Sequence, residues 1–270
     1  GVPVVCGLQG EAGFIEQFPE PWKRRSVELI RRHARAVDAF TVPYEGYIDD
    51  MAEFVDAGRS RFHVIPPGVE VESFEGAPRR PEHPFRVGYL SHIRREKGLD
   101  LLVEAFRRLY RETENGVRLC IGGELDGPGE SFWRELRDSL EADGLLDRVD
   151  FRGELDGREK REFLGNCSVF ALPSRRRECR GMACLEALSA GLPVIVPERG
   201  IFPDIVSKTG GGVLVPPEDP EAVAKALKDL AGAPKRRRRM GREGRRGVEQ
   251  HYSAQVAARA AVRVSREVVE

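Results

Sequence analysis

The chain has 270 residues, of which 40% are hydrophobic and 33% charged, and its 44 basic side chains are balanced by 44 acidic ones. This length suits one and a half to two domains, and this composition is able to build a core. A formal net charge of zero creates no overall field that would direct the chain to nucleic acid or to a membrane surface. No apolar run reaches the roughly 20 residues of a membrane-spanning helix, so none is predicted.

The cysteines are few and scattered. Their spacing is not that of metal ligands, and their number is odd: Cys6, Cys120, Cys167, Cys179 and Cys184. This pattern favours a reducing compartment, and we predict a cytoplasmic location. The sequence opens with Gly-Val-Pro, without Met and without a signal peptide, so we expect a start within a longer protein.

The first 80 residues predict a small α/β unit. Strands are expected at residues 2–9, 39–43 and 62–66, and helices at residues 22–36 and 47–57. A sheet of three strands is narrow and leaves an open edge and an uncovered face. We therefore interpret residues 1–80 as the rear part of a larger, acceptor-side Rossmann-like domain with its front absent, together with a hinge that begins at Pro66.

From residue 85 onward, short apolar runs alternate with helical patterns. Strands are expected at residues 85–91, 117–123, 149–155, 168–174, 193–197 and 212–216, and helices at residues 99–113, 129–145, 158–167, 181–190 and 219–231. This alternation predicts a parallel sheet with helices on both faces, which we assign to residues 81–250. An amphipathic helix in residues 251–270 is expected to pack back toward the first unit.

One segment carries most of the chemistry. Glu178 and Glu186 stand eight positions apart, and Gly181 lies between them, where a strand gives way to a helix. The N-terminus of a helix presents unpaired amide groups and about half a positive charge, which suits a phosphate. Gly181, Met182 and Ala183 are therefore predicted to meet a diphosphate. At about 1.5 Å per residue, Glu186 would reach the ribose of a sugar nucleotide while Glu178 faces the sugar.

Four motifs resemble those of retaining glycosyltransferases of the two-Rossmann-domain (GT-B) type, group 1, often numbered family 4. They are Ile-Pro-Pro-Gly-Val-Glu at residues 65–70, Lys-Gly-Leu-Asp at residues 97–100, Val-Phe-Ala-Leu-Pro-Ser at residues 169–174, and the E-x7-E pattern at residues 178–186. The resemblance covers nearly the whole chain. It implies a complete C-terminal and a partial N-terminal Rossmann-like domain, a nucleotide-diphosphate sugar as donor, and retention of configuration. Without an Asp-x-Asp motif, neither a metal nor another cofactor is implied.

The resemblance also implies roles for single residues. Glu178 and Lys97 would be catalytic, because the Lys97 ammonium would stabilise charge on the departing diphosphate. The alternative for Lys97 is a solvated loop lysine. Where the family usually has a phosphate-binding arginine, this chain has His92. Either Arg94 or Arg95 compensates for this change, or both are ordinary surface charges.

On the acceptor side, Gln9 stands near the position where many relatives place a histidine, and Glu11 is a candidate substitute. The alternative is a simple polar turn. Asp204, at an acidic helix-start position, either holds its own loop or touches substrate. The acceptor itself, which would be a glycan, a lipid or a small molecule, is not identified by the sequence.

Several alternatives stay open. The basic run from Lys235 to Arg246 is either a solvated helix face or a surface for anionic lipid headgroups, and it lacks the interleaved aromatic residues of a nucleic-acid site. The departures at His92 and Gln9 favour a non-catalytic sugar-nucleotide-binding or scaffold protein. A GT-B-type epimerase or phosphorylase is a third candidate. We expect this chain alone to have little transferase activity.

Overall fold

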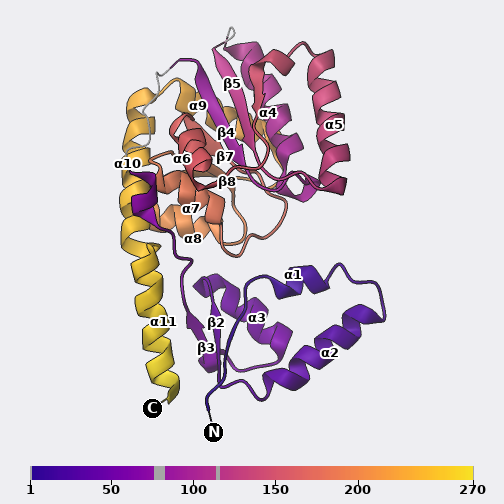
Figure 1. The fold of residues 1–270 in the computed structure, drawn as a ribbon, viewed down its shortest axis with the longest axis vertical. Coiled ribbons are helices and arrows are strands. Elements are labelled where there is room, and N and C mark those ends of the chain that lie inside the picture. Colours follow the sequence, from indigo (N-terminus) through magenta and orange to yellow (C-terminus); the bar gives the residue numbers. More distant parts are fainter. Residues whose placement is uncertain (1, 76–82, 114–115, 270) are drawn as a thin grey trace.

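The computed structural model describes residues 2–75, 83–113 and 116–269 (Figure 1). Its strands form two sheets, one of three strands and one of six, and every neighbouring pair is parallel. Helices pack around both sheets, as the alternation in the sequence predicts. The predicted domain boundary at residues 80 and 81 lies outside the described residues.

The smaller sheet has the order β1 (Val5–Gly7), β2 (Ala39–Val42), β3 (Phe62–Val64). Its connections contain α1 (Glu11–Ile15), α2 (Trp22–Ala34) and α3 (Ile48–Val55). The sequence predicts the three strands and the two longer helices, whereas α1 is new. β1 is shorter than expected, and its first residue, Val5, and the preceding Val4 are 43% and 48% exposed. Within the described residues this edge of the sheet has no further strand.

The larger sheet has the order β6-β5-β4-β7-β8-β9. Its strands are β4 (Phe85–Leu90), β5 (Val117–Gly122), β6 (Val149–Phe151), β7 (Val169–Ala171), β8 (Val194–Pro197) and β9 (Gly212–Val215). Every residue of β7 and β8 is buried, which explains their continuous apolar sequence. The chain builds outward from β4 to β6 and then returns to place β7 beside β4. In such sheets ligands bind at the carboxyl ends of the strands where the direction reverses, here between β4 and β7.

The helices of this unit are α4 (Leu99–Glu112), α5 (Gly127–Ala142), α6 (Gly157–Gly165), α7 (Met182–Ser189), α8 (Phe202–Thr209) and α9 (Pro220–Ala231). Side chains that cap the first turn determine where several of these helices begin. The Asp126 side chain accepts a hydrogen bond from the amide of Gly129, so α5 begins two residues before the predicted start. Asp156 and Glu159 form a reciprocal capping box at the start of α6.

Two further helices, α10 (Pro234–His251) and α11 (Ala254–Val269), run down one side of the molecule (Figure 1). Between them, Tyr252 is buried, and its carbonyl accepts a hydrogen bond of 2.9 Å from the amide of Val69. Farther along, Glu267 Oε2 of α11 lies 3.3 Å from Nδ1 of His63 on β3. α11 therefore lies beside the smaller sheet.

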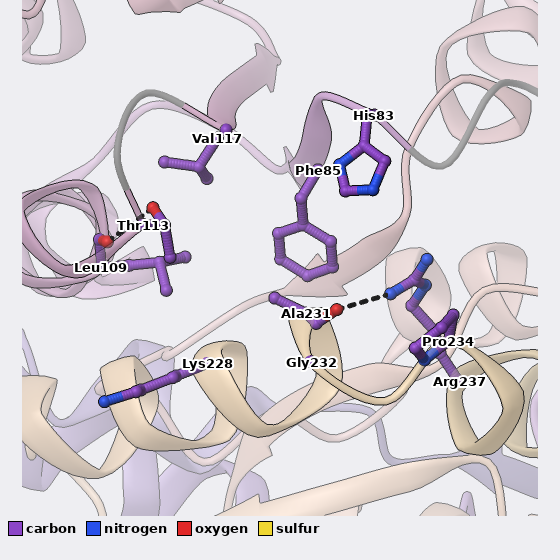
Figure 2. A pocket seen from close by; sticks show the side chains of 11 residues that line it. His83, Phe85, Leu109, Thr113, Val117, Lys228, Ala231, Gly232, Pro234 and Arg237 are labelled. Carbon is purple, nitrogen blue, oxygen red and sulfur yellow. Dashed lines mark hydrogen bonds between the residues drawn. The ribbon is translucent and has the colours of Figure 1, made fainter.

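The basic run on α10 is not a uniformly solvated face. Arg237 is buried, and its Nη1 donates a hydrogen bond of 2.8 Å to the carbonyl of Leu230. Its guanidinium lies over the ring of Phe85, and burial lowers the pKa of Arg237. Figure 2 shows these groups beside a cavity of about 350 Å³ at the amino ends of β4 and β5. This cavity is at the opposite end of the sheet from the carboxyl ends of β4 and β7.

Candidate functional site

A cleft of about 880 Å³ lies between the two sheet units, at the carboxyl ends of β4 and β7. The smaller unit contributes residues after β1 and from α2 and α3, and the larger unit contributes Lys97 and residues 175–180. The sequence-predicted residues Gln9, Lys97 and Glu178 all line this cleft. The fold therefore brings the acceptor-side candidate to the same space as the two candidate catalytic residues.

Lys97 and Glu178 form a direct ion pair. Lys97 Nζ lies 2.6 Å from Glu178 Oε1, and each side chain is 17% exposed. The hydroxyl of Ser174, which is fully buried, donates a second hydrogen bond of 2.8 Å to the same carboxylate oxygen. At Gly98 φ is +75°, and a Cβ there would lie 2.0 Å from the carbonyl oxygen of Pro173. The glycine after Lys97 thus lets the segments that follow β4 and β7 meet backbone to backbone.

Glu186 also pairs with a lysine. Lys160 Nζ of α6 lies 2.9 Å from Glu186 Oε1 of α7, and the side chains are 29% and 17% exposed. Nothing in the sequence singles out Lys160, because a lysine on a helix rich in charged residues has no distinctive pattern. Only the positions of α6 and α7 in the fold bring its ammonium group to a motif residue.

α7 begins at Met182, one residue after the predicted start. Gly181 precedes it with φ of +61°, and no side chain caps its first-turn amides. From the sequence, we expect the missing side chain of Gly181 to leave room for a diphosphate. In the structure α8 occupies that space, since a Cβ on Gly181 would lie 2.8 Å from Cδ1 of Ile205. The glycine is therefore required by its left-handed backbone and by the packing of α8 against it. The amides of Met182 and Ala183 remain the candidate phosphate donors at this helix end.

The two candidate donor-binding bases near Lys97 are held by carboxylates of another loop. His92 Nδ1 lies 3.0 Å from Glu124 Oε2, and Arg94 forms an ion pair with Asp126. Both carboxylates follow β5. The side chains of His92 and Arg94 face that loop, whereas the Arg94 carbonyl accepts a hydrogen bond of 2.9 Å from the amide of Lys97.

On the acceptor side, the Glu11 carboxylate accepts hydrogen bonds from the amides of Gln9, at 2.7 Å, and Gly10, at 3.0 Å. Glu11 therefore stabilises the turn before α1. The Asp204 carboxylate accepts a hydrogen bond of 2.6 Å from the Tyr252 hydroxyl. Of the two roles that the sequence leaves open for Asp204, these contacts favour the local structural one.

Two side-chain contacts cross the cleft. Arg177 Nη2 lies 3.0 Å from Asp50 Oδ2 of α3, and the Tyr47 hydroxyl donates a hydrogen bond to the Cys179 sulfur. Burial is the main cause that raises the pKa of Tyr47 and of Cys179. Arg177 and Cys179, on either side of Glu178, thus connect this segment to the smaller sheet unit.

Within the part of the chain that the structure describes, no group of three or more His, Cys, Asp or Glu residues is placed to hold a metal ion. In the same part, no helix combines the length and the apolar character needed to cross a bilayer.

Residues 71–247 match the family of glycosyl transferases group 1. The chain belongs to this family. Over 267 residues, it is 27% identical to the MMP alpha-(1->4)-mannosyltransferase of Mycolicibacterium hassiacum, an alignment that covers 97% of this chain and 62% of that relative. It is 29% identical to the D-inositol 3-phosphate glycosyltransferase of Streptomyces avermitilis, covering 86% of this chain and 52% of that one. The chain therefore spans about half to three fifths of these relatives.

Solved structures share the fold. The Anabaena protein HepE in complex with UDP and glucose superposes with a TM-score of 0.82 at 18% identity, covering 97% of this chain and 71% of that one. The sucrose-phosphate synthase of Thermosynechococcus elongatus gives a TM-score of 0.81 at 23% identity, covering 98% and 67%. The predicted GT-B type of α/β fold is confirmed.

Proposed function

We propose that this group 1 chain is the donor-binding part of a retaining glycosyltransferase that moves a sugar from a nucleoside diphosphate sugar to an acceptor. One observation carries the proposal: both glutamates of the E-x7-E motif are paired with lysines around the start of α7, at 2.6 Å and 2.9 Å. The relatives include a mannosyltransferase, and a structure of the same fold holds UDP-glucose; both support the same reaction class.

In the proposed site, the diphosphate lies at the start of α7 beside Lys97. The ribose hydroxyls meet Glu186, and the sugar meets Glu178. As the bond to the sugar breaks, negative charge grows on the diphosphate, and the Lys97 ammonium and the α7 amides stabilise it. Retention follows if the acceptor hydroxyl attacks from the face that the diphosphate leaves.

The acceptor would enter through the cleft beside Gln9. Its amide group is able to hydrogen-bond a hydroxyl but does not accept a proton at neutral pH, and both observed bonds of Glu11 go to backbone amides. We therefore propose that the leaving diphosphate, rather than a side chain of this turn, takes the acceptor's proton.

If the acceptor is borne by a membrane, the basic run offers a peripheral contact. Arg237 points into the larger unit, but Arg236, Arg239, Arg242 and Arg246 are exposed on α10. Each exposed arginine near an anionic surface contributes about 1 kcal/mol. Sedimentation with phosphatidylserine vesicles tests the contact, and equal binding to phosphatidylcholine vesicles would exclude it.

Calorimetry with UDP, GDP and ADP tests the donor site. We expect one of them to bind, and Glu186→Ala to weaken that binding by about tenfold or more, which corresponds to about 1.4 kcal/mol. Glu141→Ala, on the exposed face of α5, is the matched control and should change nothing. If none of the three binds, the donor-site proposal is wrong.

The second candidate function is a non-catalytic sugar-nucleotide-binding protein, favoured by His92, which is held by Glu124 instead of facing the Lys97 pair. Turnover separates the two. In a protein of the relatives' full length, Glu178→Ala should abolish transfer from a nucleotide sugar while nucleotide binding persists. Binding without any turnover in the unmodified protein would favour the second candidate.

A further inference from the structure

A pair of cysteines lies on the larger sheet away from the cleft. Cys120 on β5 is in register with Asp150 on β6 and with Gly88 on β4, so their side-chain positions share one face of the sheet. Gly88 has no side chain, and the sulfur of Cys167 occupies the space where one would be. A Cβ on Gly88 would lie 2.6 Å from Cys167 Sγ.

Cys167 arrives there from the connection between α6 and β7. Its sulfur lies 3.3 Å from the carbonyl oxygen of Phe163, one turn earlier, which fixes its direction. The Cys167 thiol also forms a hydrogen bond with the Cys120 thiol. The two residues are 47 positions apart in the sequence, yet they are 7% and 9% exposed at the same point of the sheet.

We propose that Cys120 and Cys167 form a dithiol site that closes to a disulfide in the presence of a peroxide. Strand register and the space left by Gly88 bring both sulfurs to one face of the sheet, where the two thiols are in contact. The contact with Cys167 lowers the pKa of Cys120, against the opposing effect of burial, and this favours its thiolate.

The other cysteines differ. Burial raises the pKa of Cys184, of Cys179 and of Cys6, so their thiols are less reactive. Cys184 is also fully buried in α7. The hydrogen-bond partner of Cys179 is the Tyr47 hydroxyl, and a hydroxyl does not form a disulfide.

The reaction with hydrogen peroxide balances. The Cys120 thiolate attacks one peroxide oxygen, the O–O bond breaks, and a sulfenic acid and water result. The Cys167 sulfur then attacks the sulfenic sulfur, its S–H bond breaks, and a second water leaves. Two thiols lose two electrons and two protons in total, and one peroxide is reduced to two waters.

Tryptic mapping tests the proposal, because each cysteine falls in its own peptide. Cys120 lies in residues 119–134 and Cys167 in residues 162–175, while the other three lie in residues 1–23, 178–180 and 181–199. After treatment with hydrogen peroxide, alkylation and digestion without reductant, we expect peptides 119–134 and 162–175 to be linked, with a mass about 2 Da below their sum. The closed form should also melt about 5 °C or more above the reduced form, since the bond restricts a long loop in the unfolded chain.

Cys120→Ser and Cys167→Ser are conservative, and the remaining thiol in each should be trapped by dimedone as a sulfenic acid instead of forming a link. Cys184→Ser is the control and should leave the link intact. The proposal is overturned if the unmodified protein shows no such link while Cys6 or Cys179 is oxidised, or if either peptide links preferentially to another cysteine. These readouts use the unmodified chain, so they do not depend on how well a variant folds.

Discussion

A Lys160→Met variant keeps the length of the side chain and removes the ammonium that holds Glu186. The two groups lie 2.9 Å apart and are 29% and 17% exposed, so solvent screens the pair only in part. A hydrogen bond to a charged group is worth about 1.5–3 kcal/mol net, and partial exposure places this one near the lower end. Without Lys160, a bound nucleotide must itself order the Glu186 side chain. We therefore expect the nucleotide affinity to fall by about 5- to 20-fold, or about 1–1.8 kcal/mol.

Calorimetry on the unmodified chain, Lys160→Met, Glu186→Gln and the double variant measures this coupling. If the lysine acts through Glu186, the double variant should bind nearly as well as Glu186→Gln, with a coupling energy of about 1 kcal/mol or more. Arg158→Met on the same helix is the matched control, because its pair with Glu162 is largely exposed. Tighter binding by Lys160→Met would show that the lysine competes with the nucleotide, and unchanged binding would show that it has no effect on affinity. Either result would refute the reasoning.

Three further predictions concern stability. Gly181→Ala should lower the free energy of unfolding by about 2–4 kcal/mol, because it adds a clash to a left-handed φ. Gly153→Ala, where φ is +68° and the space is open, should lower it by only about 1 kcal/mol. Equal losses in thermal unfolding would show that packing at Gly181 is unimportant. Arg237→Ala should lower the free energy of unfolding by about 2 kcal/mol, because it removes a buried hydrogen bond and a ring contact. Arg236→Ala should change it by no more than about 0.5 kcal/mol. Similar values for both variants would contradict the burial of Arg237. Burial raises the pKa of Tyr44 from 10.0 to about 12, so its contribution to the free energy of unfolding is present below pH 10 and lost as the pH rises to 12. Chemical unfolding over this range should show that the free energy of unfolding declines less steeply with pH in Tyr44→Phe. Parallel curves for the two proteins would contradict the shift.

Much of the fold follows from local pattern. Buried strands such as β7 and β8 are apolar at every position, and helices such as α6 begin at recognisable caps, so their places are predictable. The ends of helices and strands are less predictable. α1 is only five residues long and has no apolar period, and β1 is limited to the three residues that are in register with β2. Pairing partners are a property of the whole sheet and are not encoded within a single strand.

In the candidate site too, some contacts are predictable from the sequence and others are not. The placement of Glu178 and Lys97 in one cleft is predictable from motif resemblance, because both segments follow central strands. The Lys160 contact is not, since it depends on how α6 packs against α7. The engagement of His92 with Glu124 escapes prediction for a related reason. Glu124 follows the Gly-Gly turn after β5, and only the neighbouring positions of β4 and β5 bring that turn to His92.

The two lysines also resolve an electrostatic difficulty in the motif. Glu178 and Glu186 flank the proposed place of a diphosphate, so two unpaired carboxylates would repel it. Like charges about 6 Å apart, at an effective dielectric constant of about 20, repel by about 3 kcal/mol. Lys97 and Lys160 balance these carboxylates one for one, and the amide groups at the start of α7 then leave the site with a net attraction for anions. The glutamates remain able to accept hydrogen bonds from sugar and ribose hydroxyls, because each pair engages only one oxygen of the carboxylate with its lysine.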